Sequence, residues 1–145
     1  MQFKSPSTPE IIDILTEGGV KPSAQRMMIL RYLMENRTHP TVDEIFKALQ
    51  PASPTLSRTT VYNTLRRLTA AGIINCIGNT GCGDGARWDY PYYPHSHFLC
   101  TECGHVADVD FRLAPEPLAE MLLHYEVRSA EVIVKGLCPR CASAG

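Results

Sequence analysis

The pattern of apolar and polar residues predicts helices in the first half of the chain. Thr8-Pro9-Glu10 is typical of a helix start, and Gly18-Gly19 indicates its end. Ser23 is expected to cap a second helix that buries Met27, Leu30, Leu33 and Met34. Residues 41–44 form a capping box, and Val42, Ile45, Phe46 and Leu49 repeat at the spacing of one helix face.

A fourth helix is expected between Ser57 and Ala71, followed by a β-hairpin. Its buried stripe is predicted to be Val61, Leu65 and Leu68. Gly72 suits the left-handed position after a helix, and residues 73–77 and 86–90 are typical of two strands. Three helices, a recognition-type helix and a hairpin together predict a winged helix-turn-helix domain. The exposed face of the fourth helix then supplies candidate DNA-binding residues, namely Arg58, Thr59, Tyr62, Asn63, Arg66 and Arg67.

The remaining residues predict a second, smaller domain. The proline-rich stretch 90–94 suits a hinge, so we expect domains at residues 1–90 and 91–145. Strands are predicted at residues 98–99, 106–111 and 127–137, with a helix at 115–124. The expected class is α+β, with a winged-helix domain and a small α/β domain of about fifty residues. A core of that size is marginal without a staple or oligomerisation.

Composition changes this picture little. The 145 residues are 44% hydrophobic, as in a folded protein, and carry a net charge of only −1. Residues 1–90 hold ten Lys or Arg against eight acids, and residues 91–145 hold four against seven. No signal-like or membrane-spanning run is seen, so we expect a cytoplasmic protein that binds no membrane.

Four of the six cysteines form two C-x-x-C pairs with 34 residues between them, Cys100 with Cys103 and Cys138 with Cys141. Two such knuckles present four thiolates to one ion, and tetrahedral thiolate coordination favours structural Zn²⁺. A thioredoxin-like redox motif is the alternative. Proteins of that kind have a single C-x-x-C motif at a helix start in a βαβ unit, whereas this sequence has two such motifs and predicts no βαβ unit. Cys76 and Cys82 fall outside this arrangement and are expected to be free thiols.

Several histidines and acids form a weaker pattern. His95 and His97 share one face of an extended segment, Asp108 lies in the following strand, Asp89 ends the second hairpin strand and His39 precedes the third helix. Each residue taken alone has an ordinary explanation, as a turn residue or a surface acid. Three imidazoles and two carboxylates together suit Fe²⁺, Mn²⁺, Co²⁺ or Zn²⁺.

With these motifs in order, the chain resembles the ferric uptake regulator superfamily of bacterial metal-dependent repressors. The matching segments are residues 19–26, 39–45, 58–65, 95–104 and 138–141. The resemblance implies a homodimer that binds a pseudo-palindromic operator in double-stranded DNA, with structural zinc on the four cysteines. It also implies a regulatory Fe²⁺ or Mn²⁺ between the domains, held by His39, Asp89, His95, His97 and Asp108. Pro94 stands where many relatives have a further histidine, so this chain departs from the family pattern at an additional metal site of those relatives.

Asp89 resembles the peroxide-sensing branch of the superfamily, because iron-uptake and zinc-uptake regulators tend to have Glu there. In that branch the residues matching His39 and His95 are oxidised with Fe²⁺, and the repressor then leaves DNA. The expected function is therefore a peroxide-responsive repressor rather than an enzyme. An iron-uptake repressor is the nearest alternative. An iron oxygenase is a more distant one, because no substrate motif supports it. A zinc-storage module is also more distant, because it does not explain the basic helix.

Overall fold

The computed structural model describes residues 5–77, 85–91, 96–110, 115–126 and 132–144. It divides into two compact units, Met1–Pro91 and Tyr92–Gly145. Helices and strands are both present, which confirms the expected α+β class. No helix among the described residues is long and apolar enough to cross a membrane.

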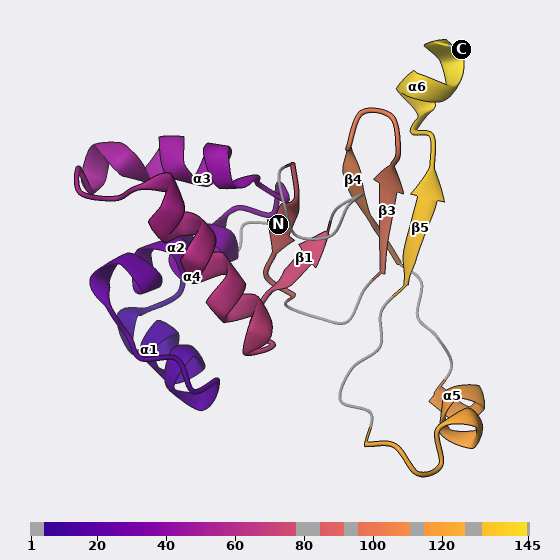
Figure 1. The fold of residues 1–145 in the computed structure, drawn as a ribbon, viewed down its shortest axis with the longest axis horizontal. Helices are drawn as coiled ribbons and strands as arrows, with labels where there is room; N and C mark the ends of the chain where they lie inside the picture. Colours follow the sequence, from indigo (N-terminus) through magenta and orange to yellow (C-terminus); the bar gives the residue numbers. More distant parts are fainter. Residues whose placement is uncertain (1–4, 78–84, 92–95, 111–114, 127–131, 145) are drawn as a thin grey trace. The chain divides into compact units, whose positions relative to one another are not determined.

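The first unit contains helices α1 (Thr8–Glu17), α2 (Ala24–Glu35), α3 (Val42–Leu49) and α4 (Arg58–Ala70), with a 3-10 turn η1 (Gln50–Ala52). Strands β1 (Asn75–Ile77) and β2 (Arg87–Asp89) pair antiparallel after them (Figure 1). This order is that of a winged helix-turn-helix domain.

Capping explains where these helices begin. Ser7, Ser23, Thr41 and Ser57 each accept a hydrogen bond from a backbone N–H in the first turn of α1, α2, α3 and α4. Thr41 and Glu44 form the predicted capping box. Gly72 follows α4 with a φ of 75°, the left-handed conformation predicted for it.

One apolar core fills the first unit, with contributions from all four helices and the hairpin. The predicted stripe of α4 is buried, together with Thr64. In α3 only Ile45 is fully buried, and Val42, Phe46 and Leu49 pack partly exposed against the core. Trp88 from β2 is 1% exposed and closes the core beneath the hairpin. The first unit therefore has a hydrophobic core of its own.

The second unit contains strands β3 (Ser96–Cys100), β4 (Val106–Val109) and β5 (Ile133–Gly136) and helices α5 (Pro115–Met121) and α6 (Pro139–Ala144). The sheet order is β4-β3-β5, with β4 antiparallel and β5 parallel to β3 (Figure 1). Strand β5 therefore occupies an edge of the sheet among the described residues. The sequence did not predict α6, which is only six residues long.

One cysteine prediction was wrong. Cys76 in β1 is disulfide-bonded, whereas we expected a free thiol. Pairing depends on whether the fold brings two sulfurs within bonding distance, and composition and spacing do not reveal this. Cys82 lies outside the described residues.

Candidate metal centres and nucleic-acid interface

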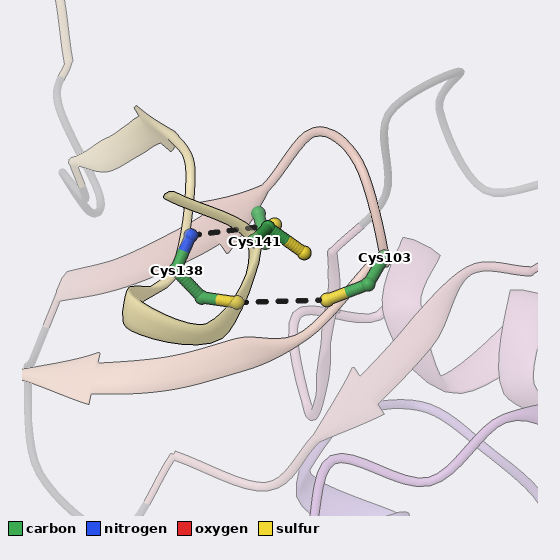
Figure 2. A group of neighbouring side chains, drawn as sticks. Cys103, Cys138 and Cys141 are labelled. Atoms are coloured by element: carbon green, nitrogen blue, oxygen red, sulfur yellow. Dashed lines mark hydrogen bonds between the residues drawn. The ribbon is translucent and has the colours of Figure 1, made fainter. Parts of the chain in front are cut away.

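The sulfur atoms of Cys100, Cys103, Cys138 and Cys141 all lie within 4.8 Å of one another. Cys100 ends β3, Cys103 lies in the turn after it, and the other two flank the start of α6. Figure 2 shows Cys103, Cys138 and Cys141 converging, with 3.8 Å between the sulfurs of Cys103 and Cys138. Two knuckles thus bring four thiols together, as a tetrahedral zinc site requires.

The backbone around this cluster favours thiolates. The N–H of Cys138 donates to the sulfur of Cys100 at 3.4 Å. Hydrogen bonds from the backbone of Cys103 and Cys138 lower the pKa of the Cys100 thiol to about 6. A side-chain hydrogen bond with Cys138, together with burial, raises the pKa of Cys141 to about 12. Four adjacent thiols cannot all ionise by themselves, and a divalent cation removes that conflict. The donor set therefore fits zinc.

The first unit contains one pair of predicted regulatory ligands. Nε2 of His39 lies 3.9 Å from Oδ1 of Asp89, and both side chains are buried. The separation is too long for a hydrogen bond. It does match two donor atoms that each lie about 2.1 Å from a shared ion.

The backbone of His39 is held in an uncommon conformation. Its φ is 53°, in the left-handed region that residues other than glycine seldom adopt. The His39 carbonyl accepts a hydrogen bond from Arg87 at 2.9 Å, and the next carbonyl, of Pro40, accepts one from the N–H of Trp88 at 3.0 Å. Strand β2 thereby fixes the turn that carries His39 beside Asp89.

The second unit contains another imidazole–carboxylate pair. His97 and Asp108 are directly opposite one another on β3 and β4, and Nε2 lies 3.5 Å from Oδ1. The His97 side chain is fully buried, whereas 43% of the Asp108 side chain is exposed. His95, the fifth predicted ligand, lies outside the described residues.

The exposed face of α4 carries the predicted DNA-binding residues. Arg58, Thr59, Asn63, Arg66 and Arg67 are exposed, and Tyr62 is half-buried. The Tyr62 ring meets Trp88 edge-on at 6.5 Å and has the Arg66 guanidinium 5.7 Å from its centre. Arg67 donates to the carbonyl of Gly19 at 3.1 Å. Several of these side chains are therefore already oriented by the fold.

A cavity of about 500 Å³ lies next to this face, between the start of α3, the start of α4 and the hairpin. Its lining consists of Thr41, Val42, Asp43, Arg58, Thr59, Tyr62, Gly85, Ala86 and Trp88. A second cavity of about 490 Å³ lies at the start of α2 and includes Lys21 and Arg26. Both hollows border the helix that the sequence assigns to DNA.

Sequence reasoning missed two side chains at these sites. Arg87 holds the His39 carbonyl and lies 3.8 Å from Glu44, and Asp43 pairs with Arg58. A basic residue two positions before a predicted ligand was the available signal for Arg87. For Asp43 no signal was available, because its partner is fifteen residues away on another helix.

Comparison with known proteins identifies the family. The model of the Ferric uptake regulator family matches residues 17–135. This chain belongs to the ferric uptake regulator family. The chain is therefore a metal-responsive regulator of this family.

One relative of this chain is the peroxide-responsive repressor PerR of Staphylococcus aureus strain USA300. It is 35% identical over 134 residues, which cover 91% of this chain and 89% of the relative. The PerR structure from Streptococcus pyogenes, described as a basis for peroxide sensing and gene regulation, has a TM-score of 0.50 at 26% identity and covers 97% of both chains.

The Helicobacter pylori ferric uptake regulator has a similar fold, with a TM-score of 0.68 at 19% identity and coverage of 97% of both chains. The S. aureus and S. pyogenes relatives are named as regulators, not as enzymes.

Proposed function

We propose that this protein is a metal-dependent transcriptional repressor that releases its operator when hydrogen peroxide oxidises a histidine ligand. The 35% sequence identity with a peroxide-responsive repressor, over 91% of this chain, supports this assignment. The observation that carries it is the His39–Asp89 pair, because the Asp89 side chain is one methylene shorter than the Glu that iron-uptake and zinc-uptake regulators tend to have at this position.

The DNA-binding element in this proposal is α4. Recognition helices place their N-terminal residues against base edges in the major groove. Tyr62 is assigned to a base edge, and Arg66 and Arg67 are assigned to phosphates. Charge supports this assignment, because the exposed face of α4 carries Arg58, Arg66 and Arg67.

The regulatory metal in this proposal binds His39, Asp89, His95, His97 and Asp108. Support comes from each unit by itself: the imidazole and carboxylate atoms lie 3.9 Å apart in the His39–Asp89 pair and 3.5 Å apart in the His97–Asp108 pair, separations that two ligands of an ion can have. An ion held by residues of both units favours the arrangement that fits DNA. Moving such an equilibrium from 1:99 to 99:1 takes about 5.5 kcal/mol of differential affinity. We assign the site to Fe²⁺ or Mn²⁺, which nitrogen and oxygen donors suit.

Peroxide sensing depends on which metal is present. Fe²⁺ held by these residues would supply the redox chemistry that activates hydrogen peroxide, and Mn²⁺ would not readily do so. Asp89 leaves coordination space because its side chain is one methylene shorter than that of Glu. His39 or His95 is the residue that gains oxygen: one oxygen atom of hydrogen peroxide bonds to a ring carbon, the hydrogen of that carbon moves to a ring nitrogen, and the other peroxide oxygen leaves as water. The oxidised ring then lacks the basic nitrogen lone pair that a metal ligand needs. Loss of one ligand nitrogen weakens metal binding, the metal no longer restrains the hinge, and the repressor leaves DNA.

Dimer formation is assigned to the second unit. Its edge strand β5 exposes 45% of Val134, and Leu137 after it is 51% exposed. Met121, Leu123 and Tyr125 in and after α5 are each more than 70% exposed. Large exposed apolar side chains, and an edge strand left unpaired among the described residues, are each typical of a subunit interface. A two-fold dimer requires a pseudo-palindromic operator.

The decisive experiment compares the Fe²⁺ and Mn²⁺ forms of the full chain on operator DNA before and after stoichiometric hydrogen peroxide. We expect only the Fe²⁺ form to release DNA and to gain one oxygen atom on the peptide containing His39 or His95. Peptide mass spectrometry and a DNA-binding assay measure both at matched times.

Two outcomes contradict the proposal. Operator binding that needs Fe²⁺ but survives peroxide indicates an iron-uptake repressor. Disulfides among the four cysteines, with unmodified histidines when DNA is released, indicate that zinc-site thiols are the sensor.

A further inference from the structure

Arg58 is the first residue of α4, the position from which a recognition helix addresses base edges. Its side chain is 58% exposed, yet it is not loose. Its Nε donates a hydrogen bond of 2.9 Å to Oδ1 of Asp43 on α3. Two neighbouring helices therefore determine where this guanidinium lies.

The ring of Phe46 supports the same guanidinium from one face. The central carbon of the Arg58 guanidinium lies 4.4 Å from the ring centre. Stacking on an aromatic ring uses the face of the guanidinium and leaves its edges available. Asp43 occupies only the Nε. Within the part of the chain that the structure describes, the two terminal nitrogens make no hydrogen bond.

Asp43 is itself fixed and charged. Lys47, one turn further along α3, lies 2.8 Å from its second carboxylate oxygen. Hydrogen bonds from Lys47 and Arg58 hold the pKa of Asp43 below its usual value. The carboxylate therefore remains ionised at neutral pH and binds one cation with each oxygen.

We infer that Asp43 is a positioning residue that presents the terminal fork of Arg58 to a guanine in the operator. The fork of two terminal N–H groups matches O6 and N7 of guanine in the major groove. Asp43 and Phe46 remove the rotational freedom that an exposed arginine otherwise loses on binding. This inference rests on the proposed DNA-binding function and adds the residue pair that reads one base.

The sign of the Asp43 effect separates this inference from simple electrostatics. An acid near DNA repels phosphates, so removing its charge should strengthen binding to every sequence. A positioning acid has the opposite effect on the operator, because without it the arginine fork is no longer held in place. Asp43→Asn is therefore expected to weaken operator binding while leaving random-sequence binding unchanged or slightly stronger.

The experiment begins with the Mn²⁺-loaded full chain and a random double-stranded DNA library, from which the wild-type operator is selected. Wild type, Asp43→Asn, Arg58→Lys and the double variant are then measured on that operator, on versions with each base pair changed, and on random DNA. Arg58→Lys keeps the charge but loses the fork. Asp13→Asn, an exposed acid on α1, is the matched charge control.

We expect Asp43→Asn and Arg58→Lys each to lower operator affinity about five- to tenfold, within the range for one bidentate base contact. Both variants should lose discrimination at the same G·C pair, and Asp43→Asn should have no further effect in the Arg58→Lys background. Asp13→Asn should bind as wild type does. Circular dichroism checks that every variant is folded.

Three results overturn the inference. Asp43→Asn that binds the operator as tightly as wild type shows that Asp43 does not position Arg58. Equal losses on operator and random DNA place Arg58 on a phosphate instead. A wild-type chain that selects no sequence removes the proposed DNA-binding function, and this inference with it.

Discussion

The environment of His39 shows how the fold positions a single candidate metal ligand. A left-handed φ of 53° is unfavourable for histidine and persists only where the surroundings impose it. Here the surroundings are two hydrogen bonds from β2, one from Arg87 and one from the N–H of Trp88. The same strand carries Asp89, so one short element places both donor atoms.

Asp89→Glu tests the peroxide assignment at a single residue. We expect the variant to keep metal-dependent operator binding but to respond to peroxide more slowly, because the longer side chain reaches or blocks the free coordination position. The measurement is the rate of operator release from the Fe²⁺ form after peroxide is added. Asp89→Asn serves as a control for loss of charge. An unchanged rate in Asp89→Glu would rule out this role for side-chain length.

Residue contacts of this kind were beyond sequence reasoning. His39 and Asp89 were candidates because of their types and the family resemblance, but the link from Arg87 to the His39 carbonyl depends on β2 lying beside a turn 48 residues earlier. The contact between Asp43 and Arg58 similarly depends on how α3 packs against α4. Such partners are set by tertiary structure, which local patterns do not encode.

At the scale of elements, local chemistry was sufficient for most helices. A cap is a contact between residues three apart, so Ser23, Thr41 and Ser57 could be recognised directly as helix starts. Strand ends were less accurate: residues 73–77 were predicted, whereas β1 is Asn75–Ile77. A strand ends where its partner ends, and that partner is remote in sequence. The short helix α6 follows the second cysteine knuckle and has no periodic pattern of its own.

Helix α4 provides an element-scale prediction. Arg67→Ala should weaken binding to operator and random DNA alike and reduce the salt dependence of log K by about one unit, as expected for one lost phosphate contact. Tyr62→Ala should instead relax sequence preference. Titrations on both DNAs at several salt concentrations distinguish the two effects. Arg67 also donates a hydrogen bond to the carbonyl of Gly19, so the thermal unfolding of the Arg67→Ala variant is measured as a control for stability. Parallel losses in both variants on both DNAs would reject these assignments.

At the scale of the whole molecule, the two units differ in what stabilises them. The first has an apolar core to which every helix contributes. In the second, the buried side chains of the described residues are few, and two of them are the zinc-site cysteines Cys100 and Cys138. It also exposes large apolar side chains, among them Met121 of α5 and Val134 of β5. We therefore predict that the second unit depends on metal binding and on dimer formation for its stability, whereas the first does not.

Cys138→Ser tests this division of stability. Structural zinc contributes about 10 to 16 kcal/mol of apparent binding free energy in small domains. A unit of this size cannot replace that amount with its own core. We expect the variant to lose zinc, to elute as monomer or aggregate in size-exclusion chromatography, and to bind operator poorly because a single winged helix reaches one half-site. The first unit should still unfold cooperatively, since its core contains no zinc ligand.

Ser143→Ala is the matched control for this variant, because Ser143 is an exposed residue of the same helix α6. It should retain zinc, dimer and operator binding. Zinc content by mass spectrometry and thermal unfolding by circular dichroism are measured on both variants in parallel. A zinc-free Cys138→Ser chain that remains a folded dimer would show that apolar packing alone holds the second unit together. In that case the four-cysteine cluster has another role, and redox chemistry of its thiols becomes the next property to measure.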